Sequence, residues 1–125
     1  MIKYFPAPDI EEKVKHISEK LEIKHDFSRV RFVRSHGSQA ERTLARCHAL
    51  PRIMQLALGV KAHYVIEVIS EKYNKLSEEE QTKTLIHELM HIPKSMGGGF
   101  RQHDFVCKRN VEQMYRRYKG FLIFL

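Results

Sequence analysis

The pentapeptide His87-Glu88-Leu89-Met90-His91 governs how the whole sequence is interpreted. On an α-helix its two histidines lie one turn apart on the same face, about 40° around the axis. Both imidazoles can therefore reach one Zn²⁺, with Glu88 beside the ion as a general base. The chain contains eight histidines, and a chance match has odds of roughly one in a few tens. The flanking sequence therefore has to decide whether this is a metal site.

The residues on either side of the motif predict a helix. Ser77 to Glu80 form a capping box, which is typical of a helix start. The helix is expected to continue to Ile92, because Pro93 removes a backbone donor and ends it. The motif then occupies the last two turns of a well-capped helix, which is the setting that a metal site needs.

A catalytic zinc site needs a third protein ligand and one open position. Glycines at 97–99 allow the chain to turn back, and a second helix is expected from near His103 to about Tyr118. His103 and Glu112 are nine residues apart, so on one helix they face opposite ways. Glu112 lies among polar and basic residues typical of a solvated face, so His103 is the preferred ligand. Asp104 is interpreted as an outer carboxylate or helix cap, and Cys107 as a small buried hydrophobe.

The rest of the chain predicts helices and short strands. A helix is expected over 9–22, capped by Asp9, with an apolar stripe. Strands are expected over 29–34 and 63–70, the second one central in the sheet. Residues 43–50 predict a strand followed by a helix from Pro51 to Gly59, although one extended edge strand is the alternative. The stripe of the first helix consists of Ile10, Val14, Ile17 and Leu21.

Composition sets broad limits on the kind of protein. With 125 residues and 42% hydrophobic content, residues 1–125 are expected to form a single domain. The start of the sequence lacks the pattern of a signal peptide and no spanning segment is evident, so a cytoplasmic protein without a membrane partner is expected. Cys47 and Cys107 are expected to be buried thiols rather than a disulfide. The net charge of +7 raises nucleic acid as a partner, but the basic residues are spread among glutamates, which favours a solvated surface.

The segment from Leu85 to His91, the glycine-rich loop and His103-Asp104-Phe105 together resemble the minigluzincins, a family of small zinc metallopeptidases. The resemblance implies an α+β fold like half of a thermolysin domain. Its short, mostly antiparallel sheet would carry an N-terminal helix, an active-site helix and a C-terminal helix. It also implies that His87, His91 and His103 are metal ligands and that Glu88 is catalytic. HtpX-type and SprT-type metallopeptidase domains are more distantly similar.

Peptide hydrolysis is the reaction that this constellation suits best. Zinc would lower the pKa of a water, Glu88 would accept the proton, and the activated water would attack a carbonyl. The 43–50 segment is the expected edge for an extended peptide or protein substrate. Tyr115 or Tyr118 could stabilise the oxyanion. The alternatives are a non-catalytic or blocked zinc-binding domain and a DNA-associated protease of SprT type.

The final segment, residues 119–125, is apolar from Phe121 to Leu125. Five consecutive apolar residues are unlikely to remain in water. They either pack on the core of their own domain or occupy the substrate cleft of the same or a neighbouring subunit. The second hypothesis predicts a latent zymogen or a homo-oligomer formed through this tail.

Overall fold

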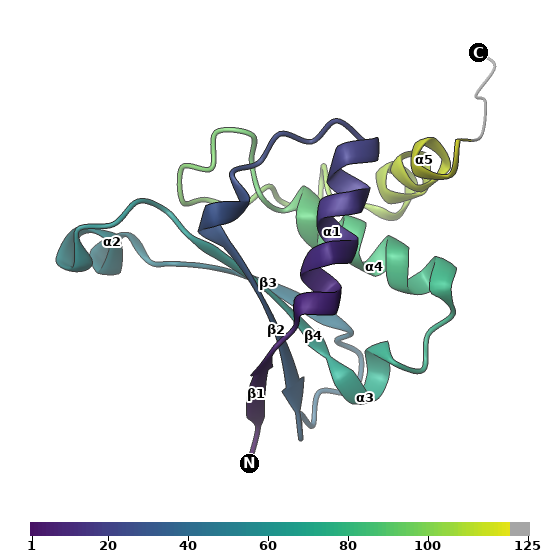
Figure 1. Cartoon of the computed structure of the whole chain (residues 1–125), viewed down its shortest axis with the longest axis horizontal. Helices are drawn as coiled ribbons and strands as arrows, with labels where there is room; N and C mark the ends of the chain where they lie inside the picture. The colour runs from purple at the N-terminus through teal and green to yellow at the C-terminus, as the bar shows by residue number, and fades with distance from the viewer. Residues whose placement is uncertain (121–125) are drawn as a thin grey trace.

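The computed structural model describes residues 1–120 and shows a sheet covered on one face by helices (Figure 1). The predicted α+β class is confirmed. The described residues contain four strands, five α-helices and a short 3-10 turn at Phe27–Arg29. The elements are β1 (Lys3–Pro6), α1 (Pro8–Lys20), β2 (Val30–His36), β3 (Ala45–Ala49), α2 (Arg52–Leu58), β4 (Tyr64–Ile69), α3 (Ser70–Tyr73), α4 (Glu78–Met90) and α5 (Lys108–Lys119).

The sheet has the strand order β1-β2-β4-β3 and is mostly antiparallel. Strand β4 pairs with β2 in parallel and with β3 in antiparallel orientation, while β1 and β2 are antiparallel. The 63–70 segment is therefore central, as predicted. Strand β3 forms one edge, and the strand-then-helix interpretation of residues 43–58 is confirmed over the single extended strand.

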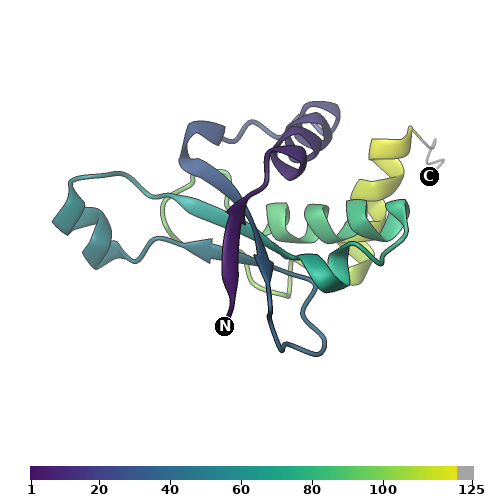
Figure 2. The same ribbon diagram turned by 60° about the horizontal axis from the view of Figure 1, so that its bottom comes forward.

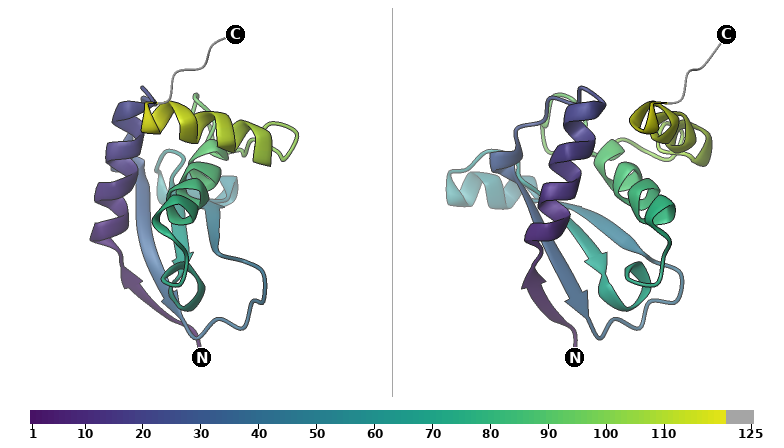
Figure 3. Two further views of the ribbon diagram at one scale, coloured as in Figure 1. Left: turned by 90° about the vertical axis from the view of Figure 1, so that its right-hand side faces the viewer. Right: turned by 45° about the vertical axis from the view of Figure 1, so that its right-hand side comes forward.

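Helices α1 and α4 cover the same face of the sheet, and α5 packs against the outer side of α4 (Figure 3). The predicted stripe of α1 is buried, with Val14 and Ile17 fully enclosed. On α4, Leu85, Ile86 and Leu89 enter the same core. This packing turns the opposite face of α4, which carries the histidines, toward β3 and α5.

Helix α1 begins at Pro8, and the predicted cap at Asp9 is wrong. The N-cap position is Ala7, which makes no side-chain hydrogen bond to the helix. A proline in the first helical turn needs no amide partner and already has a helical φ. Asp9 instead lies in the first turn and pairs with Arg34 of β2.

The second predicted helix begins later than expected, at Lys108 instead of near His103. Residues 103–105 form a turn. The Asp104 carboxylate accepts the Phe105 amide at 2.8 Å, and the Asn110 side chain donates to the Phe105 carbonyl at 2.7 Å. Side-chain bonds of this kind compete with helical pairing. His103 consequently sits on a turn, so the helix-face comparison with Glu112 does not apply.

Two further expectations concern the C-terminal tail and membrane-spanning helices. The apolar residues 121–125 lie outside the described residues. Among residues 1–120, no helix has the length and apolar character needed to cross a bilayer.

Candidate metal centre

Three imidazoles converge beside the open edge of the sheet. His87 lies in the last turn of α4, which ends at Met90 and not at the predicted Ile92. His91 is the C-cap residue one turn further on, and His103 comes from the turn before α5. One nitrogen from each ring can be chosen so that all three lie within 4.8 Å of one another. The Nε2 atoms of His87 and His91 are 3.3 Å apart. Two nitrogen ligands on a tetrahedral ion are about 3.3 Å apart when each bond is about 2.0–2.1 Å, so the donor set fits a zinc-sized ion.

The ring of His91 is oriented by the chain that folds back over it. Its Nδ1 lies 2.8 Å from the Arg101 carbonyl, and the Arg101 amide donates to the His91 carbonyl at 2.8 Å. A proton on Nδ1 leaves the Nε2 lone pair free to bind an ion. Burial, aided by the charges of His91 and His103, lowers the pKa of His87. The lowered pKa of His87 favours the neutral imidazole that metal binding requires.

The glycine loop before His103 is held by Tyr64, a residue that the sequence interpretation did not select. The buried Tyr64 hydroxyl donates to the Gly99 carbonyl and accepts the Gly98 amide, each at 2.9 Å. Gly98 has a φ of +103°, which a side chain would strain. Tyr64 appears in the sequence as an ordinary β-strand residue, and no sequence signal reveals its hydroxyl partners. It fixes the path of the chain toward the third histidine.

Glu88 lies between the histidines and strand β3. It is 7% exposed, and one of its carboxylate oxygens is 3.9 Å from His87 Nε2. In the protein without a bound ion, burial raises the pKa of Glu88 to about 8, and the backbone of Cys47 opposes this rise. A carboxylate with a pKa near neutrality is suited to exchange protons as a general base.

The other candidate ligands occupy different surroundings. The Glu112 carboxylate accepts from Lys83 at 2.7 Å, which holds its pKa below the usual range. Asp104 caps its own turn. The two cysteines are free thiols and only half-buried. Burial and the charge of Glu88 raise the pKa of Cys47 to about 12, so its thiol stays protonated.

Two cavities meet at Glu88. The larger, about 480 Å³, lies between β3, α4 and α5 and includes residues 42–45, Lys83 and Lys108. The smaller, about 220 Å³, lies beside Cys47, His91 and residues 100–103. Together they form a cleft along the β3 edge. Neither cavity wall includes Tyr115 or Tyr118; Tyr115 lies beneath Lys83, and Tyr118 packs on His16 and Lys20 of α1.

Two histidines at the end of α4, a third on the turn that folds back over it, a buried glutamate and an open strand edge together make an arrangement typical of a metallopeptidase site. The family model described as "Putative phage metallopeptidase" matches residues 2–120. The chain belongs to this family. No curated protein and no solved structure matches. The family and the histidine cluster support a metallopeptidase with a metal cofactor, while the narrower likeness to minigluzincins stays a prediction.

Proposed function

We propose that the protein is a zinc-dependent endopeptidase in which His87, His91 and His103 hold the ion. The observation that carries this proposal is the convergence of three ring nitrogens beside the buried Glu88 carboxylate. Histidine nitrogens at this spacing suit Zn²⁺, and three ligands leave one position for water or substrate. The 3.3 Å separation of the α4 nitrogens supports zinc over larger, oxygen-preferring ions.

Substrate is expected to bind as an extended strand along β3. The outer edge of β3 pairs with no other strand among the described residues, so its free backbone groups can pair with a peptide. Ala45 and Cys47 of β3 line the larger and the smaller cavity respectively. A peptide on this edge would cross Glu88 with residues on both sides, which is the arrangement required for cleavage within a chain.

The chemistry divides between the ion and Glu88. A bound Zn²⁺ supplies Lewis acidity, acidifying a water and polarising the scissile carbonyl. Glu88 takes the proton of the attacking water and delivers it to the departing amine nitrogen. The enclosed position of Glu88 keeps bulk water from competing for that proton.

The glutamate substitution Glu88→Gln tests this proposal. The amide keeps the volume of the side chain but accepts no proton, so casein hydrolysis should fall by about 10²–10⁴-fold. Zinc content and thermal stability should remain close to wild type. Wild-type activity in the Glu88→Gln protein would reject Glu88 as the base, and activity that survives zinc removal by a chelator would reject the metal mechanism.

The outcome also separates the peptidase from the blocked zinc-binding domain. In a blocked or non-catalytic domain, wild type and Glu88→Gln would both bind zinc and neither would hydrolyse casein. The zymogen and oligomer hypotheses depend on residues 121–125 and remain predictions, as do the cytoplasmic location and the DNA-associated alternative.

A further inference from the structure

The β3–β4 connection carries an apolar tip that nothing in the described chain covers. Helix α2 projects from the end of the sheet, away from the other helices (Figures 1 and 2). None of its residues is buried. Ile53, Leu56 and Leu58 are 76%, 85% and 60% exposed, and Met54 and Val60 are also exposed. We define residues 51–61 as the hairpin tip; it contains five of the large exposed apolar side chains of residues 1–120.

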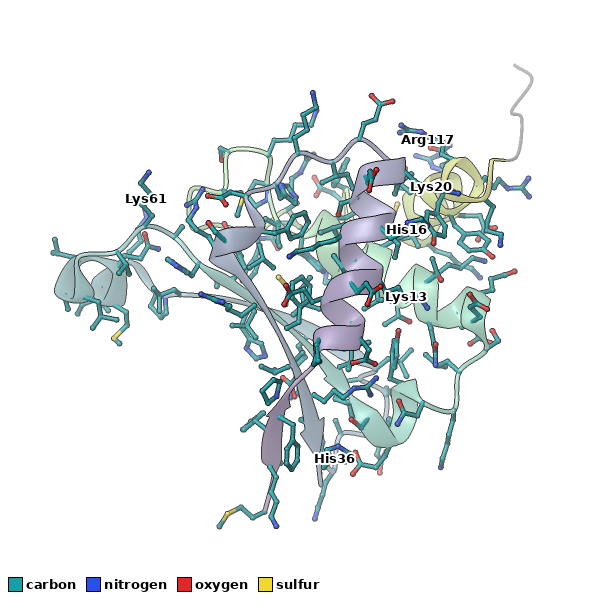
Figure 4. All side chains as sticks on the ribbon, in the orientation of Figure 1. Lys13, His16, Lys20, His36, Lys61 and Arg117 are labelled. Carbon is teal, nitrogen blue, oxygen red and sulfur yellow. The ribbon has the colours of Figure 1, made fainter. Side chains whose placement is uncertain are left out.

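The charge of this hairpin is one-sided. Residues 42–66 contain no Asp or Glu, although the whole sequence has 15 such residues. The same segment contains four cations: Arg42, Arg46, Arg52 and Lys61. Arg52 and Lys61 flank the apolar residues, and Lys61 projects outward from the hairpin (Figure 4). The apolar tip therefore has an anion-attracting collar.

The tip is also preorganised. Gln55 donates from its side chain to the Leu50 carbonyl at 2.9 Å, and the Leu50 amide donates to the His63 carbonyl. Gly59 ends α2 in the left-handed conformation, with φ of +66°. These bonds close the loop at its base while leaving its apolar side chains outside. Little backbone entropy therefore remains to be lost when the tip binds.

We propose that the hairpin tip inserts shallowly into a membrane surface that contains anionic lipids. The tip projects from the end of the sheet (Figure 1). Ile53, Met54 and Leu58 do not line the hollow of about 560 Å³ beside it, whose wall includes Leu56, Val60 and Gly97. These outward-projecting side chains can enter a deformable medium without a preformed groove. The aliphatic side chains of the tip suit the acyl region, while Arg52 and Lys61 are placed for headgroup phosphates. A nucleic-acid surface would use the cations but would leave Ile53, Leu56 and Leu58 in water, and the tip offers no aromatic ring for base stacking.

This inference is independent of the proposed peptidase activity. It differs from the expectation of no membrane partner, which considers only segments that cross a bilayer. Shallow insertion needs exposed apolar side chains and a basic collar, not a helix long enough to cross the bilayer. The partner class is defined by chemistry: an apolar layer beneath anionic phosphates.

Vesicle binding tests the proposal with the full-length protein. Wild type should co-sediment with vesicles of phosphatidylcholine mixed with phosphatidylglycerol and much less with phosphatidylcholine alone. The double variant Ile53→Asp/Leu56→Asp should lower the partition coefficient on the order of 100-fold, because two aliphatic side chains lose their burial. Tyr4→Ser, at an exposed position on β1, should leave binding unchanged.

A second pair of variants tests the basic residues that flank the apolar tip. Lys61→Gln should weaken binding to the anionic vesicles about fivefold, since one cation near a charged bilayer contributes that much. Lys75→Gln removes a charge of the same kind from an exposed site after α3 and should have a smaller effect. Equal losses in both variants would show attraction by net charge alone and overturn the assigned orientation.

The absence of tryptophan from the sequence provides a direct probe of depth. Leu56→Trp introduces a single indole at the tip, and its emission should shift to shorter wavelength with anionic vesicles. Tyr4→Trp should not shift. The proposal fails if wild type ignores the vesicles, or if Leu56→Trp shows no shift. It also fails if the tip instead forms a dimer that Ile53→Asp/Leu56→Asp dissolves while vesicles bind neither protein.

Discussion

The two buried glutamates, Glu88 and Glu67, have pKa values shifted in opposite directions, and this difference indicates different roles. Glu88 has few groups that favour its charge, so burial raises its pKa to about 8. Glu67 on β4 is 1% exposed, and burial alone would also raise its pKa. Ser35, His48 and the Arg46 charge outweigh that effect, and the pKa of Glu67 lies below its ordinary value. Glu88 is thus suited to exchange a proton, and Glu67 to remain ionised as part of the sheet.

The lowered pKa of Glu67 predicts how stability depends on pH. The group binds protons less readily in the folded than in the unfolded chain, where its pKa is near 4.5. Its contribution is complete above that pH and is lost as the pH falls through the lower folded value. Glu67→Gln should therefore be less stable than wild type at neutral pH.

Urea unfolding at several pH values measures this contribution. The difference in the free energy of unfolding between wild type and Glu67→Gln should shrink as the pH falls below about 4.5. Other carboxylates titrate in both proteins, so they cancel in the difference. A difference that stays constant from neutral to acidic pH would contradict the role assigned to Glu67.

At the scale of elements, the central relation is between strand β4 and the loop that follows α4. The Tyr64 hydroxyl holds the glycine loop, and the loop presents the Arg101 carbonyl to His91. Tyr64 acts through this chain of contacts without touching the metal position. It is a positioning residue, and the loss of its hydroxyl should loosen the segment that carries His103 while leaving the sheet intact.

Tyr64→Phe removes only the hydroxyl and should weaken zinc binding by about 10-fold, the lower end of the effect of losing a direct hydrogen-bond partner of a metal ligand, because Tyr64 acts through the glycine loop. A competition titration with a chromophoric chelator measures the affinity. Tyr4→Phe is the matched control at an exposed site on β1. If Tyr64→Phe binds zinc as tightly as the control, the loop does not depend on this hydroxyl.

The sequence predicts the α4 part of the metal site better than the loop part. The capping box at Ser77 and the apolar face of α4 are local patterns, and they correctly place His87 in the last turn of a helix and His91 at its end. The sequence also predicts that His103 opens a helix, and this is wrong, because α5 begins at Lys108. The position of His103 depends on contacts between distant residues, such as Tyr64 with Gly98, and no local periodicity records them. The exposure of α2 was equally hidden, because Ile53 and Leu56 have the i, i+3 spacing of a buried helix face.

At the scale of the molecule, the hairpin formed by β3, α2 and β4 carries two surfaces with different chemistry, the cleft and the apolar tip. The cleft lies where the β3 edge faces α4 and α5, and the apolar tip lies at the outer end of the same hairpin. Strand β3 is common to both. If both proposals hold, a peptide near a membrane surface could enter the cleft while the hairpin tip stays inserted in the lipid.

The zymogen hypothesis also belongs at this scale. Gly120 caps α5 in the left-handed conformation, with φ of +77°, so a truncation should retain it and remove only residues 121–125. If these residues occlude the cleft, the truncated protein should hydrolyse casein faster than the full-length chain at equal zinc content. A folded, zinc-loaded truncated protein with unchanged activity would contradict latency.

The zinc affinity of His103→Ala decides whether His103 is the third ligand, with Glu112→Ala as the matched control. We expect His103→Ala to lose at least about 100-fold in zinc affinity, more than the loss of a hydrogen-bond partner of a ligand would cause. Glu112→Ala should bind zinc like wild type, because its carboxylate is engaged by Lys83. Wild-type affinity in His103→Ala, or a comparable loss in Glu112→Ala, would contradict the three-histidine site.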